Sequence, residues 1–144
     1  MSKVSIVGAH NTKFGSFVNK NKETGEITDT CSLYELIAEA AQGAVKDAGL
    51  DPAQIDGVWV GSFAPGLFTS QDHLGPLVLD SFPDALRFKP TQRVEGACAS
   101  SSLALYNALY AIESGRFRNI LVVGVEKMNL LKTAGVTHAL AGAS

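Results

Sequence analysis

Strand-like runs of β-branched residues alternate along this chain with segments of helical hydrophobic spacing, and this alternation restricts the folds that it can adopt. The clearest strand-like run is 119–125, which reads Asn-Ile-Leu-Val-Val-Gly-Val. A continuous apolar run of this kind is typical of a strand covered on both faces in a parallel sheet. Together with the other alternating segments it predicts an α/β fold, with a mixed, mostly parallel sheet flanked by helices.

The most regular helix is predicted over 33–48. Ser32 and Glu35 match a capping box, in which the hydroxyl accepts from the amide three residues on and the carboxylate accepts from the amide of the cap. Apolar residues then recur with i, i+3, i+4 spacing, and Gly49 can supply the left-handed residue that ends a helix. Local signals alone therefore define both ends of this helix.

The other predicted elements are shorter or less regular. They are strands at 4–8, 55–61 and 91–95, a turn of helix after Asp51, and helices over 71–79 and 98–114. The polar stretch 9–30 is longer than most connections inside a compact domain. Two alternatives stay open for it, a functional loop or a small hairpin.

Composition excludes several classes of protein. With 46% hydrophobic and 18% charged residues and a net charge of −2, the 144-residue chain is expected to fold as a soluble domain. No apolar run approaches the ~20 residues of a membrane span, and the scattered basic residues do not indicate a nucleic-acid partner. Two cysteines and no apolar signal stretch indicate free thiols in a reducing location. We expect a cytoplasmic protein, with peroxisomal or mitochondrial locations left open.

The predicted chemistry centres on Cys98. This residue follows a predicted strand and the turn Gly96-Ala97, and it lies in the first turn of the next predicted helix. Unpaired amides and the positive end of the helix dipole stabilise a thiolate at such a position. The same amides are able to bind the oxyanion that forms when a thiolate attacks an acyl carbonyl. On position alone, however, a packing role is the commoner one for a free cysteine.

Few other side chains suggest a site. Cys31 precedes a helix cap in a polar stretch and is expected to have a structural or incidental role. Glu95 and Glu126 are the acids nearest the predicted strand ends, and we expect each to be solvated or to cap a helix. Structural roles and no metal site are expected for the three histidines, which lie in loop-like stretches without metal-ligand spacing: His10, His73 and His138.

Two longer motifs carry the most specific signal in the sequence. Residues 94–105 read Val-Glu-Gly-Ala-Cys-Ala-Ser-Ser-Ser-Leu-Ala-Leu, and residues 120–128 read Ile-Leu-Val-Val-Gly-Val-Glu-Lys-Met. Together with 4–15 and 56–61, these motifs resemble the thiolase superfamily, most closely the sterol-carrier-protein type of thiolase and the acetyl-CoA acetyltransferases. The resemblance spans nearly the whole chain, and the spacing between the two motifs is far more specific than a single cysteine.

The resemblance implies a reaction for Cys98. In such thiolases the cysteine at this position attacks the thioester of an acyl-CoA and forms an acyl-enzyme. A second acyl-CoA then condenses with the acyl group, or coenzyme A releases it. Coenzyme A and acyl-CoA are therefore expected as substrates, with no bound cofactor, and residues 124–128 are expected to shape the floor of the site.

The resemblance also implies a domain organisation. Thiolases consist of two similar α/β halves and a loop domain, and they usually form dimers. Residues 1–127 would be the N-terminal α/β half and residues 128–144 the start of a truncated loop domain. The histidine, the Asn-Glu-type motif and the acid–base cysteine of the C-terminal half are not in this sequence. We therefore expect a homo-oligomer or a C-terminal thiolase half as partner, and an inactive isolated chain.

Two alternative functions stay open at this stage. Residues 96–100 read Gly-Ala-Cys-Ala-Ser and resemble the nucleophile elbow of an α/β-hydrolase, with cysteine in place of serine. Such a hydrolase also needs a later acid and histidine, and His138 is the one histidine that follows Cys98. The other alternative is a thiolase-like interaction subunit that binds acyl chains or a partner without turnover.

Overall fold

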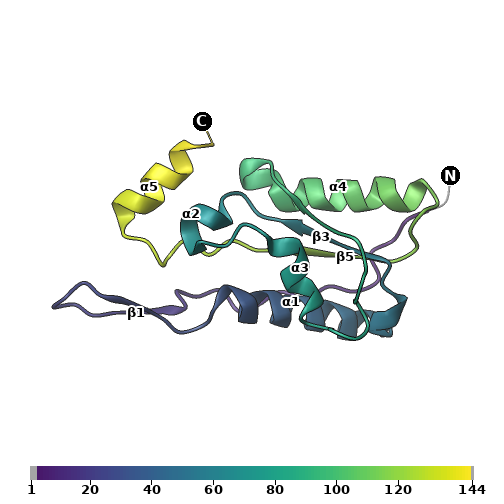
Figure 1. Ribbon diagram of the computed structural model, residues 1–144, viewed down its shortest axis with the longest axis horizontal. Helices are drawn as coiled ribbons and strands as arrows, with labels where there is room; N and C mark the ends of the chain where they lie inside the picture. Colours follow the sequence, from purple (N-terminus) through teal and green to yellow (C-terminus); the bar gives the residue numbers. More distant parts are fainter. Residues whose placement is uncertain (1–2, 144) are drawn as a thin grey trace.

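A three-stranded parallel sheet lies between two long helices in the computed structural model, which describes residues 3–143 (Figure 1). The strand order is β4-β3-β5. The elements that form these layers are β3 (Gly57–Gly61), β4 (Thr91–Val94), β5 (Ile120–Gly124), α1 (Leu33–Ala48) on one face and α4 (Ser100–Glu113) on the other. The predicted α/β class is confirmed, and every strand pair in this sheet is parallel.

Helix α1 forms as its end signals predict. The amide of Glu35 donates to the Ser32 hydroxyl at 3.2 Å, and the amide of Ser32 donates to the Glu35 carboxylate at 2.6 Å. Gly49 ends the helix with a φ of 64°. Because a residue with a side chain rarely adopts this conformation, glycine is the favoured residue at that end.

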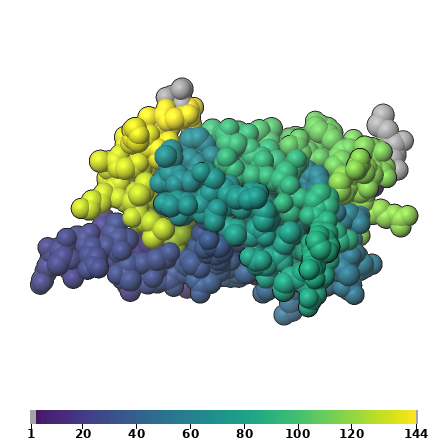
Figure 2. Space-filling model, viewed as in Figure 1, coloured from purple at the N-terminus to yellow at the C-terminus, as the bar shows by residue number. Residues whose placement is uncertain are grey.

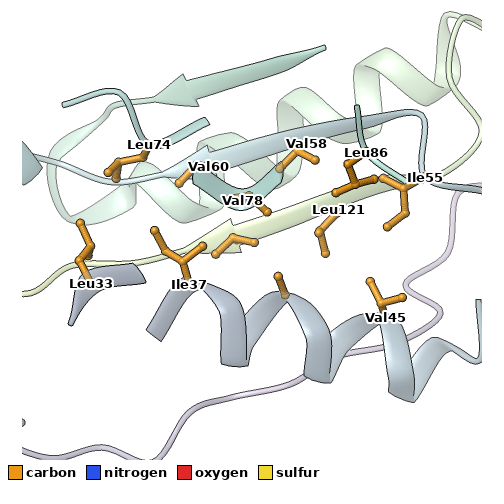
Figure 3. Close-up of a cluster of buried hydrophobic side chains, with 12 residues drawn as sticks. Leu33, Ile37, Val45, Ile55, Val58, Val60, Leu74, Val78, Leu86 and Leu121 are labelled. Atoms are coloured by element: carbon orange, nitrogen blue, oxygen red, sulfur yellow. The ribbon is translucent and has the colours of Figure 1, made fainter. Parts of the chain in front are cut away.

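The main core lies between α1 and the sheet (Figure 3). Leu33, Ile37 and Val45 on α1 face Val58 on β3 and Leu121 on β5. Side chains of a strand alternate between its two faces, so the residues between these positions point toward α4 instead. A second core cluster forms there, from Trp59, Ala104 and Ala108.

The predicted strands at 55–61, 91–95 and 119–125 are confirmed as β3, β4 and β5, each shorter by one or two residues. The sequence predicts that 119–125 is buried on both faces, and this prediction is wrong. The strand that is buried along its whole length is β3. In β5 only Leu121 and Val123 are buried, while Ile120 and Val122 are partly exposed. The reason is position, because β3 has a strand on each side and β5 is paired only with β3 within residues 3–143.

The prediction of a strand at 4–8 is wrong, because these residues pair with no strand among the described residues. They are attached to α1 instead. The amide of Ala9 donates to the Asp47 carboxylate at 2.9 Å. Gly8 lies so close to α1 that an added Cβ would come within 2.4 Å of the Ala48 nitrogen. A β-rich sequence forms no ladder where no neighbouring strand edge is in reach.

The polar stretch 9–30 contains a small hairpin, which settles the alternative left open above. Its strands are β1 (Val18–Lys20) and β2 (Ile27–Asp29), paired antiparallel. The hairpin projects from the same end of the molecule as α5 (Thr133–Ala141), as Figure 2 shows.

Short helices were only partly predicted. The helix expected over 71–79 is α3 (Leu74–Leu79), and the turn after Asp51 is the 3₁₀ helix η1 (Pro52–Gln54). Helices α2 (Pro65–Thr69) and α5 were not predicted.

Candidate functional site

Cys98 lies at the carboxyl edge of the sheet, between the end of β4 and the start of α4. Residues Ala97–Ala99 form a short 3₁₀ helix, η2, and α4 begins directly after it at Ser100. The helix predicted over 98–114 is therefore confirmed with a tighter first turn. The Cys98 side chain is exposed. A thiol in this place is accessible to a substrate that approaches the edge of the sheet.

Hydrogen bonds hold the turn that carries Cys98. The Glu95 carboxylate accepts from the amide of Ala97 at 2.6 Å. The buried Ser100 hydroxyl accepts from the amide of Gly96 at 3.0 Å and donates to the carbonyl of Ala97 at 2.7 Å. Ala97 has a φ of 49°, a conformation that non-glycine residues rarely adopt and that the surrounding contacts must stabilise. Hydrogen bonds thus hold the backbone both before and after Cys98.

Close packing against the sheet fixes the first turn of α4. A Cβ added to Gly61 would lie 2.4 Å from the Cα of Ser101, and one added to Gly124 would lie 2.3 Å from the Ser101 hydroxyl oxygen. Two strands therefore end in glycines that let the helix approach. No side chain caps the helix at Ala99. The amide of Ser100 donates to the carbonyl of Ala97 in the preceding turn. The positive end of the α4 dipole therefore remains as the feature that favours negative charge beside Cys98.

A second group of polar side chains holds the loop that follows β3. The Glu126 carboxylate accepts from the amide of Phe63 at 2.7 Å and contacts the Ser62 hydroxyl at 3.4 Å. Arg93 donates to the carbonyl oxygens of Ser62 and Phe63, each at 3.1 Å. Neither Glu95 nor Glu126 is a purely solvated acid, since each binds a backbone amide.

Lys127 is one of the polar residues near this edge that sequence reasoning missed. Its side chain is 1% exposed, and its ammonium group donates to the Asp29 carboxylate at 2.6 Å and to the carbonyl of Cys31. Burial would raise the pKa of Asp29, but the hydrogen bond from Lys127 and nearby amides holds that pKa below its ordinary value. A buried lysine needs an acidic partner, and this partner is Asp29, the single acid of β2, 98 residues away in the sequence.

Cys31 lies in a different environment from Cys98. It is partly buried, and its sulfur lies 4.0 Å from the carbonyl oxygen of Ser32. Burial raises the pKa of the Cys31 thiol, and the negative charge of Glu35 adds to this effect. Both factors disfavour the thiolate, which agrees with the structural role expected from the sequence.

The three histidines occupy separate elements. His10 lies against α1, 3.7 Å from the Glu39 carboxylate, while His73 precedes α3 and His138 lies on α5. Within residues 3–143, no three His, Cys, Asp or Glu side chains gather as metal ligands. In the same range, no helix has the length and apolar character to cross a membrane.

The fold and the site together define a class, an α/β domain that presents a cysteine at a strand-to-helix turn on the carboxyl edge of a parallel sheet. A family model described as "Thiolase, N-terminal domain" matches residues 4–144. The chain belongs to the thiolase family.

Sequence similarity to curated proteins supports the same family assignment. The chain is 38% identical to the acetyl-CoA acetyltransferase of Methanothermobacter thermautotrophicus and 39% identical to that of Methanocaldococcus jannaschii, over all of this chain and 34% and 33% of theirs. It is 33% identical to the beta-ketoacyl-[acyl-carrier-protein] synthase III of Staphylococcus haemolyticus, over 75% of this chain and 33% of that protein. The chain spans about a third of the length of the curated relatives it matches.

A solved structure agrees with the fold. The 3-oxoacyl-[acyl-carrier-protein] synthase III of Aquifex aeolicus superposes with a TM-score of 0.56 at 26% sequence identity. The match covers 67% of this chain and 30% of that one.

Proposed function

We propose that this chain takes part in acyl transfer between thioesters, as the N-terminal α/β portion of a thiolase, with Cys98 as the nucleophile. The observation that carries the proposal is the exposed Cys98 on a turn braced by Glu95 and Ser100 at the uncapped start of α4. Similarity to two acetyl-CoA acetyltransferases over the whole chain supports an acyl-CoA as the substrate.

The proposed step is a substitution at the thioester carbonyl. The Cys98 thiolate attacks the carbonyl carbon, and the positive end of the α4 dipole stabilises the oxyanion that develops. The bond between the acyl carbon and the sulfur of coenzyme A then breaks, and coenzyme A leaves as a thiolate that takes a proton from solvent. The acyl group stays on Cys98 until a second thiol or a carbon nucleophile accepts it.

The remaining steps need groups that this chain does not supply. Proton transfer to and from the second substrate requires an acid–base side chain within hydrogen-bond reach. In the family such groups belong to the C-terminal half, so we propose that turnover depends on that half or on an oligomer. We also propose that residues 1–127 form the α/β unit and 128–144 begin the loop domain, and that the protein acts in the cytoplasm.

Acylation of the isolated chain tests the proposal. Incubation with acetyl-CoA is expected to add one acetyl group, which peptide mass spectrometry locates on Cys98. The Cys98→Ser variant should stay unmodified, and the Cys31→Ser variant should react like the original chain. Acetylation of Cys31 in place of Cys98, or no acetylation of the folded chain, would contradict the proposal and favour a non-catalytic interaction subunit.

A further inference from the structure

The Ser100 hydroxyl binds backbone groups that precede it instead of capping its own helix. A serine at the start of a helix usually accepts from an amide two or three residues further on. No side-chain cap of this kind is present at the start of α4. The Ser100 hydroxyl accepts from the amide of Gly96 and donates to the carbonyl of Ala97, and both partners precede Cys98.

These two bonds occupy the Ser100 hydroxyl. The residue is 4% exposed, and its one hydroxyl proton goes to the carbonyl of Ala97. The next two serines, Ser101 and Ser102, are exposed. Ser100 is therefore placed to hold the backbone beside Cys98, and not to exchange a proton with a substrate.

The bond to the Ala97 carbonyl fixes the peptide group that joins Ala97 to Cys98. A peptide group is planar, so a carbonyl held in one direction also sets the direction of the backbone that enters Cys98. The φ of 49° at Ala97 persists only where surrounding contacts hold it. Two side chains hold Ala97, the buried Ser100 at its carbonyl and the exposed Glu95 at its amide.

We propose that Ser100 is a positioning residue for Cys98, because its hydroxyl keeps Ala97 in the left-handed conformation and so holds the thiol at the start of α4. Without this hydroxyl, Ala97 is free to return to a negative φ and the peptide group before Cys98 rotates. The thiol then moves away from the positive end of the α4 dipole, whose effect is confined to the first turn. This inference rests on the proposed role of Cys98 as the nucleophile.

Alkylation of Cys98 by iodoacetamide tests the inference without a thioester. Every protein in the comparison carries Cys31→Ser, so that Cys98 is the one thiol, and mass spectrometry gives the rate as a function of pH. Only the thiolate reacts, so the pH midpoint reports how well the turn places the sulfur. Ser100→Ala should raise this midpoint toward the ~8.5 of an ordinary thiol and slow alkylation at neutral pH about threefold or more.

Ser102→Ala is the matched control. It removes an exposed hydroxyl from the same turn of α4 and should change neither the pH midpoint nor the rate. The charged side chains of this edge, Arg93, Glu95 and Glu126, are the same in every variant. A difference between the two serine variants therefore reports the turn before Cys98.

Substitutions of Ala97 separate positioning from a general effect on stability. Glycine adopts a positive φ about as readily as a negative one, so Ala97→Gly makes the turn less dependent on Ser100. With Ala97→Gly present, Ser100→Ala should slow alkylation less than about twofold, because the two changes act on one backbone conformation. Ala97→Val is the converse, since a β-branched residue disfavours a positive φ, and it should raise the pH midpoint with Ser100 intact.

Several results would overturn the inference. They are an unchanged pH midpoint in Ser100→Ala, the same loss of rate with and without Ala97→Gly, and an equal shift in Ser102→Ala. Hydrogen exchange of β3 amides checks that each variant is folded. If Ser100→Ala does not fold, Ala97→Val decides, and an unchanged midpoint in that variant would contradict the inference.

Acetylation by acetyl-CoA distinguishes this inference from the proposed function. If no variant is acetylated on Cys98 while the differences in alkylation are found, the proposed function is wrong and the effect of Ser100 on the Cys98 thiol stands. If Cys98 is acetylated equally in all variants and alkylated equally, the positioning role of Ser100 is wrong and the proposed function stands.

Discussion

The two cysteines differ in the properties that govern thiol reactivity. Cys98 is exposed at the start of a helix, while Cys31 is partly buried and burial raises the pKa of its thiol. We predict that iodoacetamide at neutral pH alkylates Cys98 at least several-fold faster than Cys31 in the folded chain. Mass spectrometry of the variants Cys31→Ser and Cys98→Ser measures each rate alone. Equal rates in folded protein would remove the argument for an activated Cys98.

Asp56 makes folding stability depend on pH. Backbone hydrogen bonds from Arg118 at 2.7 Å and Asn119 at 3.1 Å hold the pKa of its carboxyl below the ordinary value. A carboxyl with a lowered pKa in the folded state stabilises the protein above its unfolded pKa of about 3.9, and this stability is lost as the pH falls through the folded pKa.

Asp56→Asn should therefore lower the free energy of unfolding at pH 7 by about 1 kcal/mol and make little difference at pH 2. Urea denaturation at the two pH values measures the difference. Asp51→Asn is a suitable control, because the Asp51 side chain accepts from the amide of Ala53 at the start of a short 3₁₀ turn, where asparagine is an equally good cap. A loss for Asp56→Asn that is as large at pH 2 as at pH 7 would contradict the charge-based explanation.

At the scale of elements, the contact between α4 and the sheet decides where Cys98 lies. Gly61→Ala would place a Cβ 2.4 Å from the Cα of Ser101, so the helix or the strand must move. We expect a loss of about 1–3 kcal/mol in the free energy of unfolding and slower alkylation of Cys98.

Gly135→Ala on α5 is the control, because its nearest neighbour would be Leu131 at an ordinary 3.4 Å. That change should alter stability by less than about 1 kcal/mol, in the favourable direction. Unfolding curves that are the same for both variants would show that the close approach of α4 does not matter.

Elements with complete local signals were predictable, and elements that depend on distant contacts were not. The capping box and Gly49 define α1 from its own residues, and the apolar run around Leu121 needs only burial to become a strand. Residues 4–8 have an equally strong strand composition but lack a neighbouring edge. A segment of strand composition pairs only where another strand edge is in reach, and the composition of residues 4–8 does not contain that information.

The residues of the candidate site also differ in whether local sequence or distant contacts determine their position. The place of Cys98 between a strand and a helix was predictable from the sequence, and its role as nucleophile stays a prediction. The burial of Lys127 was not predictable, because its partner Asp29 lies in the stretch 9–30, for which the sequence did not decide between a loop and a hairpin. Ser100 was also missed, since nothing in a run of three serines distinguishes the one whose hydroxyl braces the turn.

At the scale of the whole molecule, α4 exposes several large apolar side chains. Leu105, Tyr106 and Tyr110 are 47%, 55% and 60% exposed, and Leu103 is 40% exposed. Apolar patches of this kind mark interaction surfaces or cause association. We predict that the isolated chain forms oligomers at high concentration. Light scattering that shows a monodisperse monomer of 15.1 kDa would contradict this prediction.

The central claim is that this chain carries the nucleophile of a thiolase and depends on a second portion for turnover. Thiolysis of a 3-ketoacyl-CoA by coenzyme A, followed over many turnovers, tests both parts at once. We expect no sustained turnover from the chain alone, and turnover from its complex with the remaining two thirds of the Methanothermobacter relative. Cys98→Ser should abolish that turnover and Cys31→Ser should preserve it. Sustained thiolysis by the chain alone, or by the Cys98→Ser complex, would contradict the claim.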